Sequence, residues 1–120
     1  MRVLVALKPR AYRDALVHAI KRTRRRVAVH FLDPDLLDYE TRYLEPQVVI
    51  CDQVTPAVRE YAICWVEIPY CDPPRAVVNI KGQAEIVPDI SIDELISVID
   101  RAEALARRRA DADSVQASLL

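Results

Sequence analysis

The segment Glu45-Pro46-Gln47-Val48-Val49-Ile50-Cys51-Asp52, followed by Pro56, decides the expected fold. Its four consecutive apolar residues are typical of a strand that is buried on both faces. Asp52 then lies at the carboxyl end of that strand, where open α/β sheets place their ligands and their chemistry. We therefore start from a parallel sheet with Asp52 near its functional edge.

The residues before this segment alternate between strand-like and helix-like patterns. Apolar runs over residues 2–7 and 27–32 are typical of strands. Between them, residues 10–25 carry apolar side chains at helical spacing, and a shorter helical pattern covers residues 33–43. This β-α-β-α-β succession with short connections predicts a parallel sheet with right-handed crossovers.

The regular alternation of strand-like and helix-like patterns ends after Asp52. Residues 55–61 can form only a short helix, and strand-like runs follow over residues 63–68 and 76–80. The loop of residues 70–75 between these runs is too short for a helical crossover, so parallel and antiparallel pairing of the second run both stay open. We expect an α/β fold with a flavodoxin-like sheet of order 2-1-3-4-5 and a shortened or rearranged region around strands 4 and 5.

The end of the chain contains one more turn and a last helix. Lys81-Gly82 can turn the chain into a short run over residues 85–87, and Ser91-Ile92-Asp93-Glu94 matches the S-x-x-E capping box of a helix start. We expect one domain over residues 1–106. Residues 107–120 are polar and rich in small side chains, which predicts a frayed or disordered tail.

Composition excludes several classes of protein. Gly82 is the only glycine, so neither a P-loop nor a G-x-G-x-x-G turn is present. The only histidines, His18 and His30, are too far apart in the sequence for an H-E-x-x-H zinc site. No apolar run approaches the length of a membrane span, and three cysteines are consistent with a reduced, cytoplasmic protein. The net charge is −1, and we read the basic cluster of residues 21–26 as the end of a helix. We therefore expect no cofactor, no metal, no membrane contact and no nucleic-acid partner.

Two segments resemble the receiver domains of bacterial response regulators. One is the Asp52 segment with its following Pro56, and the other is the run 82–88, which precedes Asp93-Glu94-Leu95. The resemblance covers most of residues 2–105 and implies a flavodoxin-like fold from two-component signalling. It also implies that Asp52 stands at the phosphoacceptor position.

The chain departs from the receiver pattern around that aspartate. Receivers carry acidic residues after the first strand, to hold Mg²⁺, and a lysine before the closing proline; here these positions hold Lys8-Pro9-Arg10 and Val87-Pro88. Phosphoryl transfer requires a divalent ion and fixed cations around the transferred group. We therefore expect a non-catalytic, degenerate receiver that acts as a protein-interaction module in signalling. The alternatives are a phosphoaccepting receiver at Asp52 and an anion-binding or small-molecule-binding domain at the Lys8 and Arg10 crevice, to which Arg13 could contribute.

Two further predictions concern contacts. Lys8 and Asp52 follow strands expected to be neighbours, so we expect them to form an ion pair. The short region after Asp52 leaves apolar side chains without a covering helix, which predicts an interaction surface and a homodimer. Its candidate interface residues are Trp65, Tyr70 and Ile68, with ordinary core packing as the alternative for the two aromatic side chains.

Overall fold

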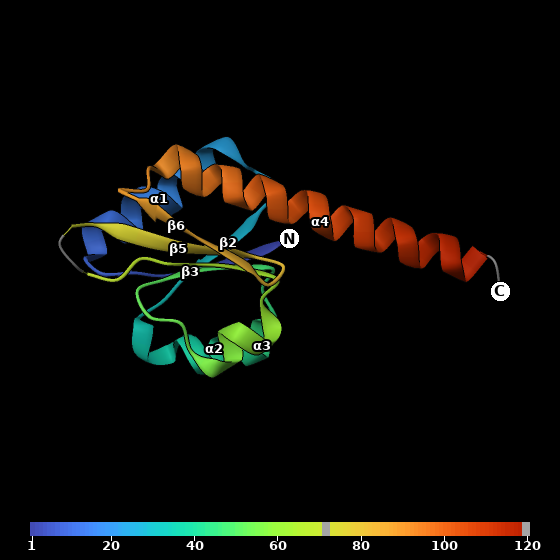
Figure 1. The fold of residues 1–120 in the computed structure, drawn as a ribbon, viewed down its shortest axis with the longest axis horizontal. Helices are drawn as coiled ribbons and strands as arrows, with labels where there is room; N and C mark the ends of the chain where they lie inside the picture. Colours follow the sequence, from blue (N-terminus) through green and yellow to red (C-terminus); the bar gives the residue numbers. More distant parts are fainter. Residues whose placement is uncertain (71–72, 119–120) are drawn as a thin grey trace.

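The computed structural model describes residues 1–70 and 73–118, the last six of them by their backbone alone. Figure 1 shows a sheet with helices on both faces. In chain order the elements are β1 (Arg2–Ala6), α1 (Arg10–Thr23), β2 (Ala28–Phe31), the 3-10 turn η1 (Pro34–Leu36), α2 (Leu37–Leu44), β3 (Val48–Cys51), α3 (Pro56–Tyr61), β4 (Cys64–Glu67), β5 (Arg75–Ile80), β6 (Gln83–Pro88) and α4 (Ile92–Ser118).

The sheet has the strand order β2-β1-β3-β4-β5-β6. Strands β2, β1, β3 and β4 run parallel, β5 is antiparallel to β4, and β6 is antiparallel to β5. The expected α/β class is therefore confirmed, in the form of a mixed and mostly parallel sheet. The sequence had left the direction of β5 open, and its short connection to β4 fits the antiparallel arrangement. A full sixth strand replaces the short run expected over residues 85–87.

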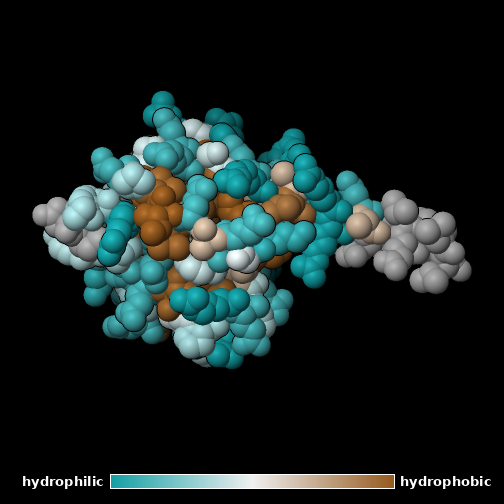
Figure 2. All heavy atoms as spheres, in the orientation of Figure 1, coloured by the Kyte–Doolittle hydropathy of each residue, from teal (hydrophilic) through white to brown (hydrophobic). Residues whose placement is uncertain are grey.

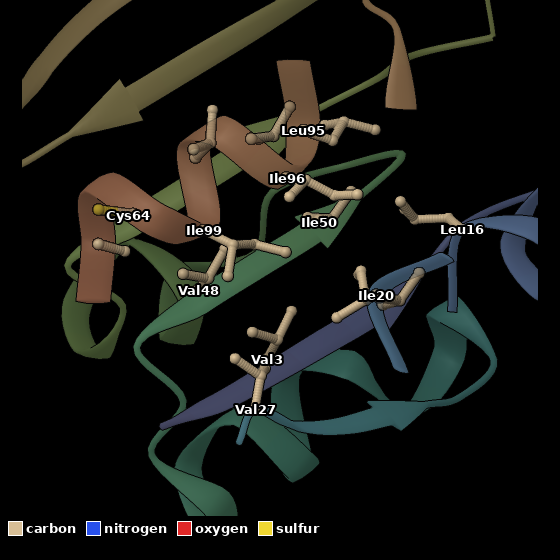
Figure 3. Close-up of a cluster of buried hydrophobic side chains, with 14 of the residues drawn as sticks. Val3, Leu16, Ile20, Val27, Val48, Ile50, Cys64, Leu95, Ile96 and Ile99 are labelled. Carbon is tan, nitrogen blue, oxygen red and sulfur yellow. The ribbon is translucent and has the colours of Figure 1, made fainter. Parts of the chain in front are cut away.

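The side chains of the sheet alternate between two separate hydrophobic cores. Val3 and Val5 of β1 face the core under α1 and α4, whereas Leu4 and Ala6 face the core under α2 and α3. Figure 3 shows the larger core, in which Ile99 of α4 lies above the strands together with side chains from α1. The continuous apolar runs of β1 and β3 follow from this double coverage, because every residue of these central strands meets a helix layer.

Local signals in the sequence set the helix starts. Thr55 caps α3 by accepting a hydrogen bond from the amide of Val58, as its position before Pro56 predicts. Ser91 and Glu94 exchange reciprocal hydrogen bonds of 3.1 Å, so the predicted capping box of α4 is confirmed.

The α4 helix continues past the end of the globular body. We expected a frayed tail from residue 107, whereas the backbone is helical to Ser118 and projects away from the sheet in Figure 1. Residues 93–118 contain no glycine or proline and are rich in alanine and arginine, which are strong helix formers. Within the described ranges, no helix combines the length and the apolar character that crossing a membrane requires.

Candidate functional site

Asp52 lies where the sequence placed it, at the carboxyl end of β3, but it stands apart from its expected partners. Its amide donates a 3.3 Å hydrogen bond to the carbonyl of Ala6, and its carboxylate takes part in no hydrogen bond or ion pair with the described residues. The predicted Lys8–Asp52 ion pair is therefore wrong. Lys8 is exposed and lines a different part of the surface, because the chain turns at Pro9 into α1.

Two other carboxylates hold the loop that follows Asp52. Glu67, at the end of β4, accepts a 2.8 Å hydrogen bond from the amide of Val54, and Asp38 of α2 accepts a 3.0 Å hydrogen bond from the amide of Ala57. The hydrogen bond from Ala57 is the main reason that the pKa of Asp38 is lowered, with further contributions from the Thr55 hydroxyl and Arg42. Sequence reasoning missed both carboxylates, since their partners are 13 and 19 residues away and no local motif links them.

The thiol of Cys51, the residue before Asp52, has low reactivity. Burial, followed by the charges of Glu67 and Asp52, raises the pKa of Cys51 to about 12. Burial also raises the pKa of Cys64 on β4. Both cysteines are free and buried, so they are packing residues rather than nucleophiles. The third cysteine, Cys71, lies outside the described residues.

The surroundings of Asp52 do not assemble the donor set of a metal centre. Among the side chains of residues 1–70 and 73–112, no three of histidine, cysteine, aspartate or glutamate gather closely enough to hold a metal ion. Lys8, Pro9 and Arg10 follow β1, at the position where a receiver carries its acidic residues. The two carboxylates around Cys51 are those of Asp52 and Glu67. Glu67 already accepts a hydrogen bond from the amide of Val54.

An open pocket of about 260 Å³ lies beside this region, at the carboxyl ends of β1, β4 and β6. Of the residues that the structure describes, two cationic side chains, Lys8 and Arg75, and one carboxylate, Asp89, line it. Burial, followed by the charge of Asp89, raises the pKa of Tyr12 in its wall. The pocket is lined by Lys8, Pro9, Tyr12, Ile68, Pro69, Tyr70, Pro74, Arg75, Asp89 and Ile90.

The structure brings together only part of the predicted site. Lys8, Ile68 and Tyr70 share the pocket, whereas Asp52 and Arg10 are not among its lining residues. Val87 and Pro88 end β6 just before the pocket residue Asp89. Arg13 is not part of an anion site: it is buried, lies over the ring of Phe31 at 5.1 Å, and pairs with Asp14 and Asp33.

A second candidate surface lies on the same face of the sheet as α2 and α3, over the strands β5 and β6. The core beneath them extends to Trp65 and the half-buried Val77. Trp65 is only 7% exposed, and the guanidinium carbon of Arg59 lies 5.4 Å from its ring centre. Trp65 is therefore a core residue at the border of this surface. Ile86 lies opposite Val77 in the β5–β6 register and is 67% exposed. We call this surface the β5–β6 face; its apolar residues are Val77, Ala84, Ile86 and Pro88, and the register places Arg75 and Asn79 on the same face.

Comparison of the chain with models of protein families, with curated proteins and with solved structures found no match. Its function therefore has to be argued from its own residues.

Proposed function

We propose that this chain is a non-catalytic, receiver-like protein-interaction domain that forms a homodimer through the β5–β6 face. The observation that carries the proposal is Ile86, a large apolar side chain that is 67% exposed on an edge strand. In Figure 2, apolar surface gathers between α4 and the α2–α3 layer, where Figure 1 places β5 and β6. Exposed apolar surface beside an unpaired strand edge is typical of an interaction site.

The receiver-like part of the proposal is supported by the arrangement of the parallel strands. Strands β2, β1, β3 and β4 lie in that order with helices on both sides, as a flavodoxin-like sheet requires. Asp52 ends β3 within this frame. The signalling context rests on the sequence resemblance, and a cytoplasmic location fits the free, buried thiols of Cys51 and Cys64.

We expect Asp52 not to be phosphorylated, because the positions that handle the phosphoryl charge in a receiver hold other residues here. A receiver needs a divalent ion and a fixed lysine to neutralise the charge of the transferred group. Here Val87 stands in place of that lysine, and Lys8 stands where acidic residues would bind the ion. We expect no mass increase on Asp52 after incubation with acetyl phosphate and Mg²⁺. A phosphorylated Asp52 would show that other residues supply these functions and would overturn the non-catalytic part of the proposal.

A second copy of the chain fits the β5–β6 face better than a dissimilar partner. The strand β6 is exposed at nearly every residue and presents about half of its backbone groups to a free edge. Two such edges can pair antiparallel about a two-fold axis, and pairing centred on Ile86 places the two isoleucines opposite each other. Pro88, which has no amide hydrogen, sits at the end of the strand, where it limits the pairing to a short segment.

Light scattering on a sizing column tests the homodimer. We expect the wild type to elute as a dimer and Ile86→Lys to elute as a monomer. The matched control is Tyr39→Lys on α2, because Tyr39 is 68% exposed and Ile86 is 67% exposed. Dissociation by Tyr39→Lys but not by Ile86→Lys would move the interface to α2, and a monomeric wild type would overturn the homodimer.

The pocket supports a second candidate function, the binding of a small molecule with one anionic group and an apolar body. Lys8 and Arg75 would bind the anion, while Ile68 and Tyr12 supply apolar walls. Phenyl phosphate is a suitable probe. A rise in melting temperature that is lost in Lys8→Ala but kept in Arg10→Ala supports this function, since Arg10 does not line the pocket. Equal shifts in both variants would contradict it.

A further inference from the structure

Arginines from two distant parts of the sequence lie together where α1 ends against α4. Residues 22–26 end α1 and lead into β2, and Arg107 lies on α4. Arg24 joins the two elements, because its guanidinium donates to both carboxylate oxygens of Asp100 at 2.7 and 2.8 Å. Bidentate pairs of this kind fix geometry as well as contributing energy. The end of α1 is therefore held beside α4.

The surface along this junction is hollowed in three adjoining places. One hollow, of about 360 Å³, is formed by residues 22–27 and Glu103. A second contains Arg24 and Arg107, and a third contains Arg26 and Arg107. Glu103 lines all three, so the hollows adjoin at this residue. We call this group of hollows the arginine strip; its cations are Arg22, Arg24, Arg25, Arg26 and Arg107.

The strip is basic although the chain as a whole has a net charge of −1. Among the side chains that the structure describes, these five arginines share the hollows with two carboxylates, Asp100 and Glu103, which are paired with Arg24 and Arg107. The remaining cations, Arg22, Arg25 and Arg26, are exposed and form no ion pair with any described carboxylate. Three guanidinium groups are therefore free to bind an external anion.

Helix electrostatics explain only part of this charge. Lys21 and Arg22 lie in the last turn of α1, where cations favourably meet the negative end of the helix dipole. Arg25 and Arg26 come after the helix, and Arg107 lies in the middle of α4, so none of them serves this purpose. Because these arginines gather in adjoining hollows, they suit an anionic partner that carries several charges.

We propose that the arginine strip binds the phosphate backbone of a double-stranded nucleic acid. Guanidinium groups match phosphate geometry, and a row of them suits a regularly spaced polyanion. No aromatic side chain lines the strip, so it lacks the stacking platforms with which proteins hold single strands. This proposal replaces the expectation of no nucleic-acid partner, which considered residues 21–26 without Arg107, which the fold places beside them.

Fluorescence anisotropy with labelled duplex DNA and duplex RNA tests the proposal on the full chain. If three arginines each neutralise one phosphate, the association constant should fall about 40-fold between roughly 50 and 200 mM salt. The double variant Arg25→Glu/Arg26→Glu should weaken binding by about tenfold or more at the lower salt concentration. Arg25→Ala/Arg26→Ala, which removes charge without reversing it, provides a second measurement, and circular dichroism checks that both variants are folded.

The matched control is Arg10→Glu/Arg108→Glu, which makes the same change in net charge elsewhere. Both side chains are exposed, and neither lines any of the three hollows of the strip. We expect this control to weaken binding by less than about threefold. Binding of either duplex with this pattern supports the proposal. Four results would overturn it: equal loss in both double variants, tighter binding of single strands, equally tight binding of poly-glutamate, or no binding at the lower salt concentration.

Discussion

Asp38 shows how one residue can connect two helices. Its carboxylate accepts a hydrogen bond from the amide of Ala57 at the start of α3, and Arg42 on its own helix donates a second hydrogen bond. A carboxylate near a helix start also meets the positive end of the helix dipole. These contacts explain why the pKa of Asp38 is lowered, with the hydrogen bond from Ala57 as the largest cause.

The stabilisation from Asp38 should therefore depend on pH. Its pKa in the folded state lies below the usual 3.8, so its contribution is complete above that value and is lost as the pH falls through the folded pKa. Urea denaturation should show Asp38→Asn to be less stable than the wild type at neutral pH, and this difference should shrink below about pH 3.8. Asp35→Asn, at an exposed site, is the control. A difference between wild type and Asp38→Asn that does not change with pH would contradict the assignment.

Cys51 provides a prediction about reactivity. A thiol with a pKa of about 12 is ionised in roughly one molecule in ten thousand at pH 8. In a Cys71→Ser background, the thiols of Cys51 and Cys64 should react with a thiol-specific reagent only as fast as the fold opens. Rapid labelling of the folded protein, at the rate seen in urea, would show that the thiol of Cys51 is accessible and ionised.

At the scale of elements, the β5–β6 hairpin depends on its two-residue turn. Lys81 and Gly82 have positive φ angles of 54° and 86°, as the common two-residue hairpin turns require at both positions. A Cβ atom at Gly82 would meet nothing within 4 Å, so only backbone conformation limits substitution there.

Substitution of Gly82 should therefore follow backbone preference. We expect Gly82→Ala to lower the free energy of unfolding by about 1 kcal/mol and Gly82→Asn to lower it by less, because asparagine tolerates the left-handed region. Urea denaturation of the two variants measures the difference. An alanine variant as stable as the wild type would show that the turn relaxes at no cost.

The elements that could be predicted from the sequence are those set by nearby residues. The caps of α3 and α4 follow from Thr55 and from Ser91 with Glu94, whose bonding partners lie three residues away. The pairing direction of β5 stayed open, since a short loop fits an antiparallel pair but does not by itself establish that the two runs are neighbours. The length of β6 was underestimated, because its mixed small, charged and apolar side chains lack the regular alternation of a half-buried strand.

The candidate sites were harder to predict because they depend on distant contacts. Asp52 was placed correctly at a strand end, yet its expected partner Lys8 turned away into a pocket with Arg75. The arginine strip depends on the Arg24–Asp100 pair, whose members are 76 residues apart. No spacing rule along the sequence links such residues, so the fold was needed to bring them together.

At the scale of the whole molecule, the two proposed surfaces lie on opposite sides of the sheet. The β5–β6 face lies on the side of α2 and α3, and the arginine strip follows α1 and α4 (Figure 1). Because the surfaces do not overlap, a homodimer formed through β6 would leave both arginine strips accessible. The projecting end of α4 gives the chain its length of 53 Å, compared with 28 and 25 Å in the other directions.

The homodimer is the central claim, and amide hydrogen exchange of the two sheet edges tests it most directly. The sheet ends in β6 on one side and in β2 on the other, and both strands are largely exposed, so β2 is an internal control. As the protein concentration rises, we expect exchange over residues 83–88 to slow while exchange over residues 28–31 stays constant. The sample should be concentrated well beyond the expected dissociation constant. If exchange over β6 is then still independent of concentration, the account is contradicted.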